Sequence, residues 1–189
     1  MCGIFGIVTK NNERIEKASL DAMLASLSHR GPDDHGVLEL KNCTLGQTRL
    51  SIIDLNGGHQ PMKDNSRPYT IVFNGEIYNY KELRAGLEKK GYCFSTSSDT
   101  EVILKTYIEY GDECPKYLDG MFSFALWNEE SNELFVARDR FGKKPFYYSI
   151  ESETLIVASE IKAILASGIN GEIDLSAVDN YLTLMYIPP

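Results

Sequence analysis

The N-terminal end of the chain constrains the fold most strongly. An apolar run from Ile4 to Val8 follows directly on Met1, Cys2 and Gly3. Short apolar runs of this kind are typical of β-strands. Chain termini usually fray unless tertiary contacts hold them. A strand that begins this early therefore predicts that the terminus itself is held in the fold.

The second half of the chain has the alternating pattern of antiparallel strands. From Met121 onward, the large apolar residues Phe122, Phe124 and Leu126 alternate with smaller ones. Further strands are expected at 134–137, 145–150 and 155–158. Because the connections are short turns, we expect one antiparallel meander over this part of the chain.

Helical patterns fall outside this strand-rich region. Five helices are expected, at residues 20–29, 81–90, 100–110, 160–166 and 177–185. Asn79 and Ser176 are expected as N-caps, and Ser98-Asp99-Thr100-Glu101 has the form of a capping box. Strands and helices are segregated rather than alternating, which favours a single α+β domain of antiparallel sheets with helices on their outer faces.

Composition and charge argue against several classes of protein. The 189 residues carry a net charge of −8, and the isoelectric point is about 4.9. An acidic chain is poorly suited to nucleic acid or to an anionic membrane surface. No apolar run approaches the roughly 18 residues of a membrane span. We therefore expect no nucleic-acid partner, no membrane contact and, with no secretory leader before Ile4, a cytoplasmic protein.

The cysteines and histidines do not indicate a metal site. Cys2, Cys43, Cys93 and Cys114 include no C-x-x-C pair, and the three histidines have no zinc-like spacing. Four free thiols are expected in a reducing compartment. No metal ligands are predicted.

The position of Cys2 gives it a chemistry of its own. Removal of Met1, which a residue as small as cysteine permits, would leave one residue with both a thiol and a free α-amine. An α-amine titrates at about 7.7–8.0 and a lysine side chain at about 10.4, so the amine is the better base at neutral pH. Nucleophile and base would then belong to one residue. The alternative is that Cys2 is a small hydrophobic residue at the start of a strand.

Three further stretches place polar groups at the ends of apolar runs, where binding sites concentrate. They are Arg49-Leu50-Ser51-Ile52-Ile53, Asn74-Gly75-Glu76 after the clear strand pattern at 69–73, and Asp99 at a helix start. Each has a structural alternative. Arg49 can lay its stem on the core. Asn74-Gly75 can end the strand in a turn with positive φ. Asp99 can simply favour its helix dipole.

Taken together, these stretches resemble the glutaminase domain of class II glutamine amidotransferases, which are N-terminal-nucleophile hydrolases, and within them the asparagine synthetase branch. The resemblance extends over essentially the whole chain, in order. It rests on Met1–Gly6, His29–Asp33, Arg49–Ile52, Asn74–Asn79, Ser98-Asp99 with Glu101-Val102-Ile103, Leu118–Phe122, Arg138–Gly142 and Ala158–Ala163. It implies a four-layer αββα sandwich, in which two mainly antiparallel sheets are flanked by helices.

The resemblance implies catalytic roles for three residues. Cys2 would attack the side-chain amide of glutamine and form a thioester, with its α-amine as the base. The Asn74 side chain and the Gly75 N–H would form the oxyanion hole, whose donors are commonly worth about 2.7–4 kcal/mol each. A glycine at this point lets the backbone approach the substrate closely.

Further residues are implied in substrate binding. Arg49 would clamp the α-carboxylate of glutamine, and Asp99, helped by Glu76, would receive the α-ammonium. Arg30 would brace the site. Backbone contacts beside the substrate would come from Leu50, Ser51, Ile52 and Ile53. No cofactor or metal is implied for this domain.

One stretch departs from the family pattern. In Phe141–Pro145, Lys143 stands before the second lysine, where many relatives have an apolar residue. The stretch is expected to lie outside the pocket, so that the departure leaves the catalytic roles untouched.

The resemblance also implies a partner. Residues 1–189 would be one glutaminase domain, with about 186–189 the start of a linker to a missing synthetase domain that uses ATP and Mg for asparagine synthesis. L-glutamine would be the substrate, and a homodimer is compatible with this organisation.

Four alternatives stay open. The chain could belong to another class II enzyme, such as a sugar-phosphate or phosphoribosyl amidotransferase. It could serve an asparagine-synthetase-like enzyme that amidates a sugar or peptide. It could be a cysteine–histidine protease that uses Cys2 with His29 or His35, which leaves Arg49 and Asn74 without roles. It could also be a non-catalytic module that only binds glutamine.

Overall fold

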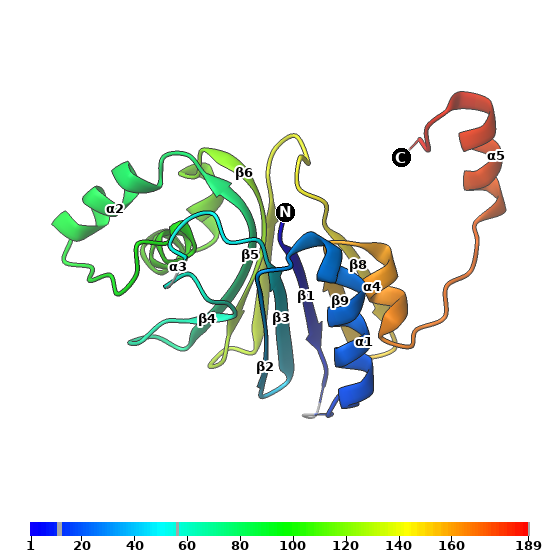
Figure 1. Cartoon of the computed structure of the whole chain (residues 1–189), viewed down its shortest axis with the longest axis horizontal. Helices are drawn as coiled ribbons and strands as arrows, with labels where there is room; N and C mark the ends of the chain where they lie inside the picture. Colours follow the sequence, from blue (N-terminus) through cyan, green and yellow to red (C-terminus); the bar gives the residue numbers. More distant parts are fainter. Residues whose placement is uncertain (11–12, 56, 189) are drawn as a thin grey trace.

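The structure is a computed structural model that describes residues 1–10, 13–55 and 57–188. In these residues two antiparallel sheets stack on each other between helices (Figure 1). The first sheet has the order β2 (Asp34–Leu40), β3 (Cys43–Arg49), β1 (Gly3–Val8), β9 (Thr154–Ala158), β8 (Tyr147–Glu151). The second has the order β4 (Met62–Lys63), β5 (Tyr69–Ile77), β6 (Gly120–Asn128), β7 (Glu133–Arg138).

Helices cover both outer faces of this pair of sheets. The first sheet is covered by α1 (Lys17–Leu27), which continues into the 3₁₀ helix η1 (Ser28–Arg30), and by α4 (Ile161–Ala166) (Figure 1). The second is covered by α2 (Tyr80–Lys89) and α3 (Asp99–Tyr110), followed by η2 (Gly111–Lys116). The expected αββα layers are confirmed.

One helix stands apart from these layers. α5 (Leu175–Leu184) lies away from both sheets in Figure 1, and none of its residues is buried. The expected linker begins just after it, and Pro189, its last residue, lies outside the described residues. No described helix is long and apolar enough to cross a membrane.

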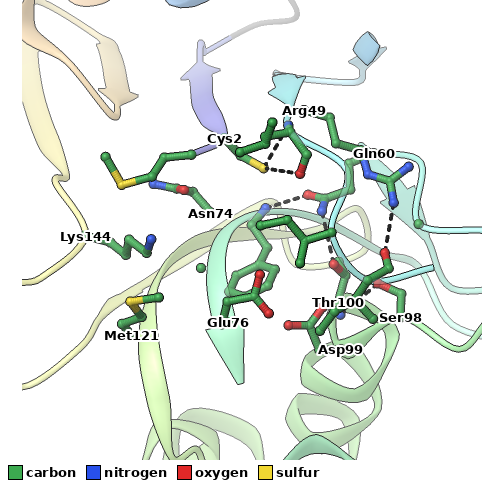
Figure 2. Close-up of a pocket in the computed structure, with 17 residues that line it drawn as sticks. Cys2, Arg49, Gln60, Asn74, Glu76, Ser98, Asp99, Thr100, Met121 and Lys144 are labelled. Atoms are coloured by element: carbon green, nitrogen blue, oxygen red, sulfur yellow. Dashed lines mark hydrogen bonds between the residues drawn. The ribbon is translucent and has the colours of Figure 1, made fainter. Parts of the chain in front are cut away.

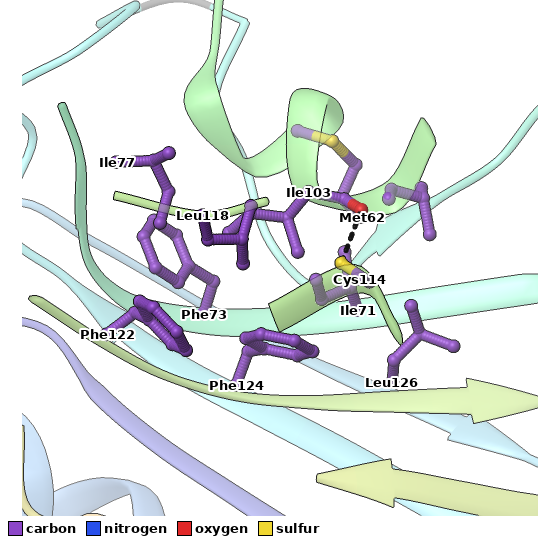
Figure 3. Packing of buried hydrophobic residues seen from close by; sticks show 11 residues of the cluster. Met62, Ile71, Phe73, Ile77, Ile103, Cys114, Leu118, Phe122, Phe124 and Leu126 are labelled. Atoms are coloured by element: carbon purple, nitrogen blue, oxygen red, sulfur yellow. Dashed lines mark hydrogen bonds between the residues drawn. The ribbon is translucent and has the colours of Figure 1, made fainter. Parts of the chain in front are cut away.

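The alternating pattern decides which core a side chain enters. Phe73, Phe122 and Phe124 point from β5 and β6 toward the helices (Figure 3). Val72 on β5 and Trp127 on β6 point the other way, into the core between the sheets. That inner core also holds Ile4, Leu45, Ala125 and Val157. β5 and β6 therefore bury side chains on both faces. Burial of each large apolar side chain contributes about 1.5–3 kcal/mol.

The N-terminus is held as the sequence predicts. β1 lies in the middle of the first sheet, between β3 and β9. The Ile4 N–H donates to Ser159 Oγ at 3.0 Å, and the Ser159 N–H donates to the Ile4 carbonyl at 2.9 Å. The residue before this pair of bonds is Gly3, so Cys2 is positioned at the end of a central strand.

Two strand predictions are wrong in an informative way. The expected meander is divided, because β6 and β7 pair in the second sheet whereas β8 and β9 pair in the first. The expected turn at Asn74-Gly75 is absent from the structure, where β5 runs on to Ile77. Antiparallel pairing with β6, which sets Asn74 opposite Ser123 and Gly75 opposite Phe122, keeps this dipeptide extended.

The capping box at the start of α3 forms only in part. Ser98 Oγ accepts from the Thr100 N–H at 3.1 Å, as expected of an N-cap. Glu101 does not reach back to Ser98. Its carboxylate instead accepts from the N–H groups of Ser95 and Thr96, at 2.9 and 2.7 Å. The glutamate therefore orders the loop before the helix.

Two other caps also differ from the prediction. Asn79 is the N-cap residue of α2 by position, but its side chain binds the Tyr117 carbonyl and the Asp119 N–H, at 2.9 and 3.0 Å. Asp174, rather than Ser176, caps α5. In the first case a contact distant in sequence competes successfully for a side chain that local pattern assigns to the helix.

Candidate active site

A cavity of about 160 Å³ opens where β1 begins, β3 ends and β5 runs past its short neighbour β4 (Figure 2). Most of the predicted site residues line it together: Cys2, Arg49, Leu50, Ile52, Ile53, Asn74, Gly75, Glu76 and Asp99. Ser51 and Arg30 do not line it. Neither His29 nor His35 does, which removes the histidine partner that a protease would need.

The Cys2 thiol is half-buried at the wall of this cavity. Its Sγ accepts from the Leu50 N–H at 3.4 Å and lies 3.7 Å from the Leu50 carbonyl. Burial raises the pKa of the thiol, whereas the Leu50 N–H and the positive charges of the N-terminus, Arg49 and Lys144 lower it. Met1 still precedes Cys2 here and is 57% exposed, so the α-amine that the sequence predicts as base becomes free once this accessible residue is removed.

Strand β5 presents an open edge to the cavity, because β4 ends early. Along this edge, the Phe73 N–H donates to Gln60 Oε1 at 2.6 Å. Four residues further along β5, the Ile77 N–H donates to Asp99 Oδ2 at 3.2 Å. Alternate N–H groups of a strand point to the same side. The N–H of Gly75, midway between these two, therefore faces the cavity.

Asn74 and Gly75 together supply two hydrogen-bond donors. Asn74 is buried, and among the described residues its Nδ2 and Oδ1 have no partner. A buried amide without partners costs free energy that a bound ligand can recover. A Cβ on Gly75 would collide with the Met121 carbonyl, so the strand requires glycine here.

Arg49, only 4% exposed, has a role that the sequence does not indicate. Its Nη2 donates to the carbonyls of Ile53 and Asp54, at 3.1 and 2.7 Å, and its Nη1 donates to that of Leu55 at 3.3 Å. The guanidinium thus holds the segment that follows it. Of its five N–H groups, the Nε–H and one on Nη1 are not used by the described residues.

The two carboxylates of the cavity differ in burial. Asp99 begins α3, and burial raises its pKa to about 6, assisted by the charge of Glu76 and opposed by the Ile77 N–H. Glu76 is only partly buried, and burial also raises its pKa, against the charge of Lys144. Two neighbouring carboxylates that are costly to ionise form a site suited to a cation.

Arg30 and Ser51 act behind the cavity wall. Arg30 Nε donates to the Cys2 carbonyl and its Nη1 to Glu160 Oε1, both at 2.8 Å. This geometry fits the expected bracing function. The Ser51 N–H donates to Asp33 Oδ2 at 2.8 Å. This N–H is therefore already bonded within the protein, and the contact of Ser51 with the substrate stays a prediction.

Several residues that line the cavity were missed, and three of them have contacts or positions that bear on the site. Gln60 donates from Nε2 to Thr100 Oγ1 at 3.0 Å as well as accepting from β5, and a single glutamine in a polar loop carries no signal for this. Gly58 lies against Arg49, where a Cβ would collide with Nη2. Lys144 lines the cavity, although its segment was expected outside it.

The profile of the glutamine amidotransferase domain matches residues 1–189. The chain belongs to this family. The glutaminase resemblance that the motifs indicate is thereby confirmed. Cofactor-free chemistry is consistent with this domain type, and no group of three or more potential metal ligands occurs in the described residues.

Curated relatives extend well beyond this domain. Asparagine synthetase [glutamine-hydrolyzing] 3 of Bacillus subtilis is 46% identical over 169 residues, which cover 88% of this chain and 28% of the relative. Asparagine synthetase [glutamine-hydrolyzing] 1 of the same organism is 41% identical over 191 residues, covering 100% of this chain and 30% of the relative. The chain thus spans about three tenths of these relatives.

A solved structure supports the fold. Glutamine phosphoribosylpyrophosphate amidotransferase from B. subtilis, complexed with ADP and GMP, matches with a TM-score of 0.71 and 24% identity. The match covers 88% of this chain and 44% of that one. At this identity the match shows the fold alone, the αββα sandwich that the motifs imply.

Proposed function

We propose that this domain hydrolyses the side-chain amide of L-glutamine to glutamate and ammonia. Cys2 Sγ attacks the amide carbon while the thiol proton passes to the α-amine of Cys2, freed by removal of Met1. The tetrahedral intermediate collapses to a thioester, and the amine returns the proton to the departing nitrogen, which leaves as ammonia. Water then hydrolyses the thioester and releases glutamate.

A single observation carries this proposal. The Cys2 thiol shares its cavity with two donors that have no partner in the described chain, the buried Asn74 carboxamide and the Gly75 N–H on the open edge of β5. Two donors from adjacent residues suit an oxygen that becomes an anion. A module that only binds glutamine has no need of a thiol at this point.

The ends of the cavity supply the rest of the specificity. The two remaining N–H groups of Arg49 would bind the α-carboxylate, and Asp99 with Glu76 would bind the α-ammonium. The pKa of Asp99 is about 6. The positive charge of a bound ammonium would favour the ionised form of this carboxyl, which is the form that binds it. The substrate would then lie with its amide at Cys2.

The ammonia would go to a synthetase domain in the remainder of a longer cytoplasmic protein. This follows from the relatives, glutamine-hydrolysing asparagine synthetases of which the chain spans about 30%. ATP and Mg would act in that domain, with aspartate as the acceptor. The alternative acceptors, a sugar or a peptide, would leave the glutaminase chemistry described here unchanged.

The test begins with protein whose intact mass shows that Met1 is absent. Glutamate release from glutamine is measured for the unaltered domain, for Cys2→Ala and for Cys93→Ala, which removes an exposed thiol. We expect Cys2→Ala to lose roughly 10³-fold or more of the rate and Cys93→Ala to retain it. Comparable glutamate release from Cys2→Ala would refute the proposal.

A further inference from the structure

The segment from Arg138 to Pro145 has no part in the function proposed so far, yet its backbone is held unusually firmly. The buried Asp139 carboxylate accepts from four backbone N–H groups. The donors are Phe122 at 3.3 Å, Phe141 at 3.1 Å, Lys143 at 2.9 Å and Lys144 at 3.0 Å. A carboxylate that accepts this many bonds fixes the course of the chain around it.

Arg138 holds the same segment from the other side. Its Nε donates to the Lys144 carbonyl and its Nη2 to the Gly142 carbonyl, both at 2.6 Å. Gly142 has a φ of 60°, and a Cβ there would lie 2.9 Å from the guanidinium, so the segment requires glycine. Lys144 is therefore fixed at both its N–H and its carbonyl.

This construction places one side chain in the cavity. Lys144 is 5% exposed and lines the cavity with Cys2 and Glu76, and its ammonium end points into it (Figure 2). In the described chain the ammonium makes no hydrogen bond or ion pair. Lys143, next to it, is exposed to solvent. A buried cation without a partner is costly, which points to a partner that forms during the reaction.

The other charged groups around Cys2 already have partners or tasks. Arg49, at the end of β3, is bonded to three carbonyls. Arg30, in η1, is bonded to the Cys2 carbonyl and to Glu160. Glu76 on β5 and Asp99 on α3 are negative, and disfavour an anion at the sulfur. The N-terminal amine would be occupied as the base. Lys144 is the cavity cation that has no such task.

We propose that Lys144 is a positioning residue whose ammonium stabilises the Cys2 sulfur as a thiolate and so sets the pH at which the nucleophile forms. The inference rests on the proposed role of Cys2. The proton that leaves the sulfur passes to the α-amine of Cys2, and Lys144 keeps its own proton throughout. Burial lowers the pKa of Lys144, as does the charge of Arg30, whereas the charges of Cys2, Glu76 and Asp139 raise it. The effect of Cys2 fits a mutual stabilisation of cation and thiolate.

The experiment measures the rate of Cys2 alkylation by iodoacetamide against pH, in domain lacking Met1, with mass spectrometry of the Cys2 peptide. Lys144→Met removes the charge and keeps the length of the side chain. We expect it to move the inflection upward by about one pH unit, so that alkylation at pH 6.5 falls about tenfold. Lys144→Arg should move it much less, and the matched control Lys143→Met not at all.

An unchanged inflection in folded Lys144→Met would overturn the inference, as would an equal shift in Lys143→Met. A second measurement covers the case in which Lys144→Met does not fold. Because the coupling is reciprocal, the Lys144 ammonium should titrate at lower pH in Cys2→Ala than in the unaltered domain, by NMR of labelled lysine. Identical titration would contradict the inference.

These outcomes separate the two proposals. If Cys2→Ala abolishes glutamine hydrolysis and Lys144→Met leaves the inflection unmoved, only the role of Lys144 fails. If Cys2→Ala still hydrolyses glutamine, the proposed function itself fails.

Discussion

Two segments border the cavity, and they are built on the same plan. Each follows an arginine that ends a strand: Arg49 ends β3 in the first sheet, and Arg138 ends β7 in the second. Each guanidinium turns back onto the carbonyls of the segment after it, residues 53–55 in one case and 142 and 144 in the other. Both segments are thus held by a charged group at the strand end rather than by a sheet.

The difference lies in what faces the cavity. Arg49 lines it, so the group that holds the 50–55 segment is also available to the substrate. Arg138 does not line it, and the 139–145 segment contributes a separate residue, Lys144. In the 50–55 segment, Arg49 both holds the backbone and is available to the substrate, so that one substitution removes both functions. In the 139–145 segment, Arg138 holds the backbone and Lys144 faces the cavity, so that the two functions can be removed separately.

The largest expected effect tests this contrast. Arg49→Met and Arg138→Met each remove hydrogen bonds from a charged donor, so each should lower the free energy of unfolding by about 1–3 kcal/mol. Arg49→Met should in addition lower kcat/KM for glutamine by about a hundredfold or more, because it also removes a charged partner of the substrate. Urea denaturation and glutamate assays measure the two quantities. Equal losses of kcat/KM would break the comparison.

A smaller effect is expected when Asp139 is replaced. This residue holds the 139–145 segment but does not line the cavity. Burial raises the pKa of this carboxyl, but its four N–H donors outweigh that effect and hold the pKa below the ordinary value. The stabilisation is therefore present at neutral pH and is lost as the pH falls below about 4. Asp139→Asn should cost about 1–3 kcal/mol of unfolding free energy at pH 7, by urea denaturation.

The pH dependence is the stricter part of that prediction. The difference in stability between the unaltered domain and Asp139→Asn should narrow when the denaturation is repeated at about pH 3. A difference that stays constant or widens in acid would show that the carboxylate charge does not hold the segment.

The smallest effect is expected at Ser51, in the 50–55 segment. Its bond to Asp33 uses the backbone N–H, which alanine retains, and its side chain does not line the cavity. Ser51→Ala should leave kcat/KM within about twofold, as for surface substitutions. A tenfold loss in the same glutamate assay would place the hydroxyl at the substrate after all.

Much of the secondary structure could be predicted because it depends on near neighbours. The strand at Ile4–Val8 and the helix before His29 follow from local periodicity, and both occur. The local predictions fail where a group distant in sequence forms a hydrogen bond with the same residue. Asn79 binds across to the chain after η2, and pairing with β6 keeps Asn74-Gly75 extended.

The sequence by itself determined the strand and helix patterns, the family and the identity of most cavity residues, because these are properties of residue type, spacing and order. Only the tertiary structure decided which sheet each strand joins, since a period of two is the same in either sheet. It also decided that β5 has an open edge at Gly75, that Ser51 lies behind the wall and that Lys144 lies inside it. Each depends on which segments meet in space, and contacts between distant residues leave no mark in the local pattern.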